Sequence, residues 1–162
     1  MMLYFAILST TSSNLSGSYN SAVAAREMVL EEEPNKKIGI INSYSTGPAM
    51  DLMLFMIQDL MKKGLNAEEI ANEVNSKYLN IKTIFTLCSF DNLVKNGRMN
   101  KIVGFVAGKL HLWGIGIASN EGTIKIKGVT LGTKGAIKAI IEDIQSRLKD
   151  AATVISHQAK NS

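Results

Sequence analysis

The sequence predicts an α/β fold, in which part of a parallel α/β layer precedes a second α/β unit that contains a hairpin. Two short apolar runs, residues 3–8 and 37–41, each lead through a Ser/Thr/Gly loop into a helical pattern. Continuous apolar runs of this length fit strands that are covered on both faces. The order strand, helix, strand, helix implies right-handed crossovers between parallel strands.

The first domain is expected to span residues 1–80. Gly64 is placed to end its second helix and Asn66 to cap the third, because glycine suits a left-handed C-terminal position and asparagine accepts backbone N–H groups. The expected helices cover residues 19–33, 48–63 and 67–79.

The helix expected at residues 48–63 is apolar on most sides. Such a helix usually lies buried between a sheet and its neighbours. Its methionines would also suit the wall of a tunnel for a flexible aliphatic chain, because methionine adapts to irregular shapes. Core packing is the default interpretation, and a tunnel wall is the sharper hypothesis.

The pattern changes near residue 81, and a second domain is expected at 81–152. The dipeptide Glu121-Gly122 after Asn120 indicates a hairpin. Thr153 to Ser156 resembles a strand, so residues 153–162 are expected to return to the first domain as a strand. The expected strands are 81–87, 110–118 and 123–129, and the expected helical segments are 90–94, 100–107 and 134–149.

The net charge of +4 is unevenly distributed. Residues 1–94 carry 7 basic and 10 acidic side chains, a net −3, whereas residues 95–162 carry 11 and 4, a net +7. A basic half is compatible with nucleic-acid binding. Its lysines are scattered, however, and no aromatic residues alternate with them. A solvated face is therefore favoured, an anionic ligand or acidic partner comes second, and no nucleic-acid partner is expected.

Cellular location is constrained by cysteine content and hydropathy. Cys88 is the single cysteine of the chain, so no intrachain disulfide can form and a cytoplasmic location is expected. Cys88 lies in an apolar run and is interpreted as a buried structural thiol. No stretch reaches the roughly 20 apolar residues of a membrane span, and residues 1–8 are interpreted as a strand rather than a signal peptide.

Residues 9–18, Ser-Thr-Thr-Ser-Ser-Asn-Leu-Ser-Gly-Ser, carry the strongest local signal for a binding site. The segment joins a buried strand to a helix N-terminus, where hydroxyls, backbone N–H groups and the helix dipole favour a carboxylate or phosphate. Gly17 would let a ligand approach the backbone closely. A capped turn explains the same residues equally well. The segment lacks the glycine and lysine pattern of nucleotide-binding loops and the G-x-S-x-G of a nucleophile elbow.

The remaining candidate residues give weaker signals. His111 and His157 are the two histidines and have no flanking ligand pattern, so no metal site is expected. Arg98 follows the tight turn Asn96-Gly97, where a guanidinium suits an anion, although a surface arginine is the favoured interpretation. An alternative function is a serine-dependent α/β hydrolase that uses Ser16 and His157, with an orienting carboxylate from the first or second half of the chain, Asp51 or Asp91.

Several motifs together resemble the DegV family of bacterial fatty-acid-binding proteins. Residues 15–22, Leu-Ser-Gly-Ser-Tyr-Asn-Ser-Ala, resemble its LSGTYQSA signature. Residues 40–43 fall where the family has its second strand and an Asp-Ser pair. Residues 93–99, Leu-Val-Lys-Asn-Gly-Arg-Met, resemble its L-x-K-G-G-R-I, and residues 154–157 resemble a late strand that ends in a ligand-side histidine. The resemblance covers nearly the whole chain.

The resemblance implies a partial α/β/α domain with a parallel sheet and a second, two-layer α/β domain with a mixed sheet. It also implies a non-enzymatic, lipid-binding subunit of a fatty acid kinase. A long-chain fatty acid such as palmitate or stearate would lie between the two domains, with no other cofactor, and a separate kinase subunit would phosphorylate its carboxylate for phospholipid synthesis. Transient membrane contact and self-association are further expectations. The residues implied at the head group are Ser13, Ser16, Gly17, Ser43, Arg98 and His157.

The sequence also departs from the family pattern. The family's N-terminal part, which supplies a second head-group hydroxyl, and its final segment are expected to be lacking, as in a fragment or a truncated copy. Such a chain is expected to expose apolar surface. The individual departures are Asn42 for Asp, Asn96 for Gly, Ser18 for Thr, Leu131 for Arg, and Leu112-Trp113-Gly114-Ile115 for Ile-Lys-Pro-Ile.

Overall fold

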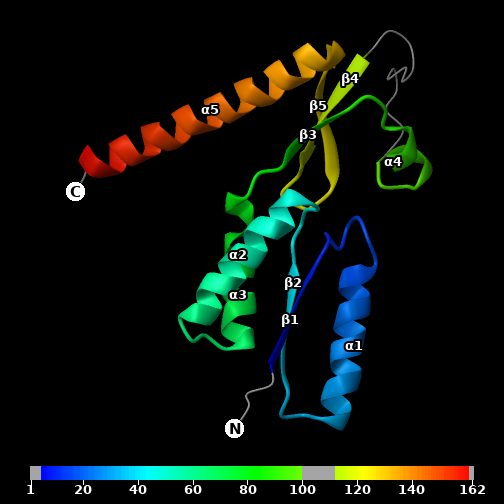
Figure 1. Cartoon of the computed structure of the whole chain (residues 1–162), viewed down its shortest axis with the longest axis vertical. Coiled ribbons are helices and arrows are strands. Elements are labelled where there is room, and N and C mark those ends of the chain that lie inside the picture. Colours follow the sequence, from blue (N-terminus) through cyan, green and yellow to red (C-terminus); the bar gives the residue numbers. More distant parts are fainter. Residues whose placement is uncertain (1–4, 100–111, 161–162) are drawn as a thin grey trace. The chain divides into compact units, whose positions relative to one another are not determined.

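The computed structural model describes the backbone of residues 5–99 and 112–160, and side chains as far as residue 150. The chain divides into two compact units. Unit 1 comprises residues 1–83 and 118–125, and unit 2 comprises residues 84–117 and 126–162. Each unit has its own sheet and helices (Figure 1).

The sheet of unit 1 consists of two parallel strands, β1 (Phe5–Thr10) and β2 (Lys37–Asn42). Their register runs from Phe5 opposite Lys37 to Thr10 opposite Asn42. The parallel pairing predicted from the strand–helix–strand order is therefore confirmed. Because parallel strands end at the same edge of a sheet, the loops after β1 and β2 emerge together.

Helices cover both faces of this sheet. The helices of unit 1 are α1 (Ser18–Glu32), α2 (Pro48–Lys62) and α3 (Ala67–Lys77), and the 3₁₀ turn η1 (Tyr78–Asn80) follows. Among these described helices, α2 and α3 pack on each other and on the strands, whereas α1 contacts the strands alone (Figure 1). This arrangement is the predicted α/β/α layering.

The core of unit 1 lies between β2, α2 and α3. Ile41, Met53 and Ile70 have no exposed side-chain surface, and they form one cluster with neighbouring aliphatic side chains. A Cβ at Gly39 would come within 2.5 Å of the Ala67 carbonyl oxygen, so glycine lets α3 approach β2 closely. Met53 therefore lies on the inner face of α2, and Ile70 lies on the inner face of α3.

The opposite face of α2 remains open. Leu52 is 53% exposed and Phe55 is 64% exposed, although both are apolar. The helix therefore contributes one side to the core and leaves an apolar side uncovered. The buried face of α2 agrees with core packing, and its exposed apolar face is compatible with the wall of a binding site.

The connection from α2 to α3 follows the predicted capping chemistry. Gly64 adopts φ +81°, a left-handed conformation that ends α2, and its N–H donates to the carbonyl of Met61. Asn66 accepts the backbone N–H groups of Glu68 and Glu69, and the Glu69 carboxylate accepts the Asn66 N–H at 2.8 Å. This reciprocal arrangement is a capping box.

Unit 2 contains the strands β3 (Ile84–Leu87), β4 (Leu112–Ala118) and β5 (Ile124–Leu131), in the order β3-β4-β5. The strands β3 and β4 are antiparallel. The described strands thus form an antiparallel sheet, where a mixed sheet was predicted. The short helix α4 (Asp91–Lys95) follows β3, and the long helix α5 (Gly132–Lys160) follows β5.

An ion-pair cluster joins α5 to β5 within unit 2. The carboxylate of Asp143, which is 7% exposed, accepts hydrogen bonds from Lys127 and from the Arg147 Nε at 2.5 Å. The Arg147 bonds, and then those of Lys127, lower the pKa of Asp143 despite the opposing effect of burial. The cluster therefore keeps a buried carboxylate ionised.

Two predictions for the second half are wrong. The strand expected at residues 153–156 is helical, because α5 continues to Lys160. A β-branched run can extend an existing helix at little cost, whereas a strand needs a neighbour to pair with. Cys88 is exposed, because it lies just beyond the end of β3 rather than inside it. The helix expected at 100–107 and His111 fall outside the described residues.

Candidate functional site

The candidate site lies at the carboxyl edge of the β1–β2 sheet. The loop of residues 11–17 follows β1, and the loop of residues 43–47 follows β2. The Ser12 N–H donates to the carbonyl of Ser45 at 2.9 Å, and the Ser43 N–H donates to that of Thr10 at 3.2 Å. These bonds continue the pairing of the strands into their loops and fix the two loops against each other.

Asn42, the last residue of β2, ties the two loops together through its side chain. Its Oδ1 accepts the backbone N–H of Ser13 at 3.2 Å and that of Tyr44 at 3.1 Å. Its Nδ2 donates to the Ser13 hydroxyl at 2.8 Å. An aspartate here would lack the donor for this last bond, so the Asn42 amide suits the contact that it makes.

The turn between β4 and β5 completes this edge, because residues 118–125 belong to unit 1. The fully buried Ser12 hydroxyl donates to the carbonyl of Gly122 at 2.7 Å, and the Asn14 side-chain amide donates to that of Glu121 at 2.5 Å. Gly122 adopts φ +75°, and a Cβ there would lie 2.3 Å from the Ser12 Oγ and 2.9 Å from the Tyr44 Cα. The sequence predicted the hairpin but not its contact with the serine loop.

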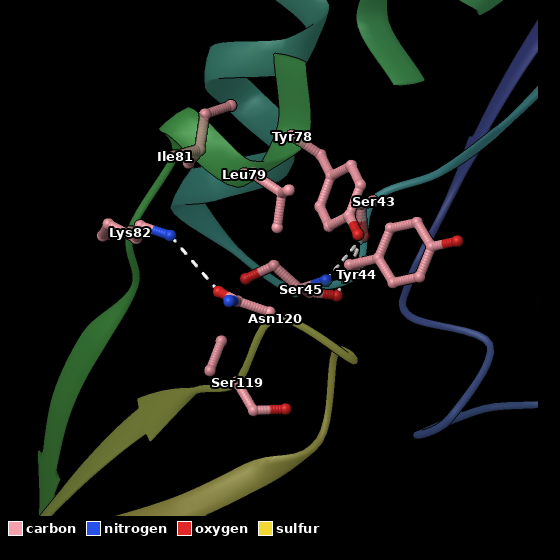
Figure 2. A pocket seen from close by; sticks show the side chains of 10 residues that line it. Ser43, Tyr44, Ser45, Tyr78, Leu79, Ile81, Lys82, Ser119 and Asn120 are labelled. Atoms are coloured by element: carbon pink, nitrogen blue, oxygen red, sulfur yellow. Dashed lines mark hydrogen bonds between the residues drawn. The ribbon is translucent and has the colours of Figure 1, made fainter. Parts of the chain in front are cut away.

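A small pocket lies beside these loops, between the end of β2, η1 and the hairpin turn (Figure 2). Tyr44, with φ +49°, stacks on Tyr78 at a ring-centroid distance of 4.1 Å. Lys82 donates to the Asn120 Oδ1 at 3.3 Å across the pocket. The pocket volume is about 20 Å³, which suits about one water molecule and is too small for an organic ligand.

The N-terminus of α1 is the feature of this edge that suits an anion. The structure describes α1 throughout, and its N-cap, Gly17, makes no side-chain capping bond and no acidic residue occupies its first turn. The Ser16 hydroxyl stands beside it and accepts the N–H of Ser18 at 3.2 Å. By contrast, α3 carries both a cap and two acidic residues. Apart from the bond between Ser16 and Ser18, the first turn of α1 has no N-cap side chain, and no acidic side chain offsets its positive dipole end.

The predicted site residues fall into two groups. Ser13, Ser16, Gly17 and Ser43 all belong to the two loops of unit 1. Ser43 is 2% exposed and donates to the Ser45 carbonyl at 2.9 Å, so its hydroxyl shapes its own loop. Ser13 is held by Asn42, whereas Ser16 and Gly17 stand at the helix terminus.

Arg98 and His157 belong to unit 2. Arg98 is exposed after α4, and its Nη1 donates to the carbonyl of Asn96 at 2.6 Å. His157 lies in α5 rather than at a strand end, and its side chain is outside the described residues. The roles of both residues at a carboxylate therefore stay predictions.

The charge of the hairpin turn is set locally. The hydroxyl of Ser119 lowers the pKa of the exposed Glu121 carboxyl, and Lys125 adds to this effect.

In the described part of the chain, no three His, Cys, Asp or Glu side chains are placed to hold a metal ion. No described helix is both long and apolar enough to cross a bilayer.

The fold and the site together define an α/β protein with a hydroxyl-rich loop at the carboxyl edge of a parallel sheet. The chain belongs to the DegV family, described as "Uncharacterised protein, DegV family", whose model it matches over residues 5–162. The resemblance seen in the sequence motifs is confirmed.

Related sequences and related solved structures support this family assignment. A DegV domain-containing protein of Streptococcus pyogenes serotype M1 is 43% identical over 139 residues, which are 86% of this chain and 50% of the relative. The Streptococcus pneumoniae Fatty Acid Kinase (Fak) B3 protein, loaded with linoleic acid, is 36% identical, with a TM-score of 0.79 over 87% of this chain and 50% of that one.

A DegV family protein from Eubacterium eligens, loaded with heptadecanoic acid, is also 36% identical. Its TM-score is 0.77, over 91% of this chain and 52% of that chain. The chain therefore spans about half the length of the relatives that it matches.

Proposed function

We propose that this protein binds a long-chain fatty acid and holds its carboxylate at the N-terminus of α1, beside Ser16 and Gly17. The observation that carries the proposal is the N-terminus of α1, which has no capping side chain at Gly17 and no acidic residue in its first turn, next to the Ser16 hydroxyl. Backbone N–H groups, a hydroxyl and the helix dipole together favour a carboxylate. Binding of this kind needs no catalytic base, so the protein is proposed to be a carrier and not an enzyme.

The class of ligand is supported by the relatives. The proteins from Eubacterium eligens and Streptococcus pneumoniae are loaded with heptadecanoic acid and linoleic acid, respectively. Both ligands combine one carboxylate with a long aliphatic chain. A free carboxylate matches the anion chemistry of the loop after β1 in this chain.

The aliphatic chain needs an apolar surface near the head group. Both α1 and α2 begin at the carboxyl edge of the sheet, and Leu52 and Phe55 project uncovered apolar surface from the first two turns of α2. Each CH₂ group removed from water contributes roughly 0.8 kcal/mol. Contact with this face of α2 would therefore supply most of the affinity, while the carboxylate site would fix the orientation.

The finer part of the proposal follows from the family resemblance. The acyl chain would lie between two domains, Ser13 and Ser43 would support the head-group loops, and Arg98 and His157 would act near the carboxylate. A separate kinase subunit would then phosphorylate the carboxylate in the cytoplasm. The name of the Streptococcus pneumoniae relative, a Fatty Acid Kinase B3 protein, supports this partner.

A binding titration with a matched serine control tests the head-group assignment. Delipidated protein is titrated with palmitate by calorimetry, alongside Ser16→Ala and Ser76→Ala. Ser76 is an exposed serine of α3, whose hydroxyl donates to the Glu73 carbonyl. Loss of one hydrogen bond to a charged group costs about 1.5–3 kcal/mol, so Ser16→Ala should weaken binding roughly 10- to 150-fold. Equal affinities for the two variants would reject Ser16 as the head-group residue.

A serine hydrolase is the alternative function, and a labelling experiment distinguishes it from a fatty-acid carrier. Asp51 is exposed in the first turn of α2, and Asp91 belongs to unit 2. An activated fluorophosphonate reports a nucleophilic serine directly. Stoichiometric labelling that Ser16→Ala abolishes would replace the carrier proposal with a serine hydrolase, whereas the carrier proposal predicts no labelling of Ser16.

A further inference from the structure

The helix α5 carries an apolar stripe that its own unit does not cover. Four side chains, which we call the α5 seam, project from it at successive spacings of four, three and four residues. Each is about half exposed or more, with exposed fractions between 47% and 65%. The members of the α5 seam are Ile137, Ile141, Ile144 and Leu148.

The seam is distinct from the face that α5 turns toward its own sheet. That inner face contains Ala136, which is 2% exposed, and Asp143, which pairs with Lys127 of β5. Ile137 and Ile144 each follow one of these buried residues by one position, which corresponds to about 100° around a helix. On this flank, Ile137 and Ile141 belong to an open, mostly apolar surface patch that extends along α5 from Lys134 to Gln145. The stripe is therefore separate from the packing of unit 2.

The spacing of the seam identifies the kind of partner. Apolar residues at alternating intervals of three and four residues are the a and d positions of a heptad, which pack against an equivalent helix. A second copy of this chain supplies such a helix with a self-complementary stripe. We propose that two copies of this protein associate through their α5 seams, with the two α5 helices antiparallel.

Charge selects the antiparallel orientation. Lys134 continues the seam by three residues toward the N-terminus of α5, and Asp150 lies near its other end. A parallel pair would bring the two Lys134 side chains together on the seam. An antiparallel pair centred between Ile141 and Ile144 instead places each Lys134 beside Asp150 of the other copy, and it opposes the two helix dipoles.

The charges that flank the seam are compatible with this pairing. Lys138 pairs with Glu142 within the same helix at 3.7 Å, and Arg147 pairs with Asp143 at 2.5 Å. These flanking cations are thus neutralised by their own chain. Association through the seam does not require the fatty acid site of unit 1, so the inference is independent of the proposed function.

Sedimentation velocity between about 1 and 100 µM tests the association. The parent protein is expected to form a dimer in this range. Ile141→Asp should raise the dimer dissociation constant roughly 30-fold or more, because it places an unpaired charge at the centre of the contact. Met28→Asp is the matched control, because Met28 is 68% exposed on α1 and lies off the seam. Far-ultraviolet circular dichroism of each variant verifies that the helices are retained.

Two results would overturn the dimer: a parent protein that is monomeric throughout this range, or a dimer that Ile141→Asp weakens no more than Met28→Asp does. Disulfide trapping then tests the orientation, on a Cys88→Ser background because Cys88 is exposed. An equal mixture of Ile137→Cys and Leu148→Cys proteins should form crosslinks between the two variants. Efficient crosslinking of each variant with itself would instead indicate parallel helices and overturn the antiparallel pairing.

Discussion

Gly122 provides a sharp test of how the candidate site is assembled. The turn at Gly122 reaches the loop after β1 through the hydrogen bond from the Ser12 hydroxyl, at 2.7 Å. The change Gly122→Ala adds one methyl group at a position with φ +75°. That methyl group would lie 2.3 Å from the Ser12 Oγ and 2.9 Å from the backbone of Tyr44. The loop and the turn cannot both keep their positions.

The expected cost has two parts that can be separated. A left-handed conformation costs an L-residue about 1–2 kcal/mol relative to glycine. Forced displacement of close-packed groups costs about 1–3 kcal/mol, and weakening of the Ser12–Gly122 bond adds about 0.5–1.5 kcal/mol. Gly64→Ala isolates the first part, because Gly64 adopts φ +81° and a Cβ there would have no neighbour within 4 Å.

Urea unfolding of both variants measures the difference. We expect Gly122→Ala to lower the free energy of unfolding by about 1.5–4.5 kcal/mol more than Gly64→Ala does. In the double variant Ser12→Ala/Gly122→Ala, removal of the hydroxyl relieves one of the clashes, so the loss should be smaller than the sum of the single losses by about 0.5–3 kcal/mol. Equal losses for Gly122→Ala and Gly64→Ala would show that the turn does not pack on the serine loop.

Two further predictions concern each unit separately. Met53 is fully buried in the core of unit 1, so Met53→Asp should lower the free energy of unfolding by about 3–5 kcal/mol and should also reduce fatty-acid binding. Leu54 is exposed, so Leu54→Asp should change the free energy of unfolding by less than about 1 kcal/mol in the same urea titration. Asp143 has a lowered pKa in the folded state, so its carboxylate stabilises the fold above its ordinary pKa of about 3.9, and this contribution is lost as the pH falls through the lower folded value. Asp143→Asn should therefore cost about 1–2 kcal/mol at pH 7 and progressively less below about pH 4 in thermal unfolding, and a cost that is independent of pH would contradict the ion-pair account.

The parallel sheet and its helices could be predicted because their signals are local. The apolar runs at 3–8 and 37–41 have the length of a strand, and each is followed at once by a loop and a helix. The structure differs in that β1 is only partly buried, with Leu8 41% exposed. Gly64 and Asn66 act within a few residues of their positions, so their capping roles are visible in sequence. Local chemistry and the global fold agree in this part of the chain.

The assembly of the site could not be predicted in the same way. The Asn42–Ser13 contact joins positions 29 residues apart, and the Ser12–Gly122 contact joins positions 110 residues apart. No pattern in either segment specifies the other, because a serine or an asparagine in a loop has many suitable partners. The sequence therefore indicated a hydroxyl-rich loop but not the groups that hold it.

The errors in the second half have a common origin in short, ambiguous segments. The run Thr153-Val154-Ile155-Ser156 has strand propensity, yet it extends α5, because propensity is a weak preference that context overrides. Cys88 follows an apolar run but lies just past the last residue of β3, so a boundary shift of one residue exposes it. Burial near an element boundary depends on structure that the local sequence does not contain.

The central claim is that this protein holds a long-chain fatty acid through a carboxylate site at the N-terminus of α1. Native mass spectrometry of the purified chain, followed by solvent extraction, measures this directly. The account predicts one bound fatty acid per chain, which Ser16→Ala depletes and Ser76→Ala retains. The family resemblance implies an acyl chain of about 14–18 carbons, and each buried CH₂ contributes roughly 0.8 kcal/mol to its retention. A chain that carries no lipid and takes up none from added palmitate would contradict the claim.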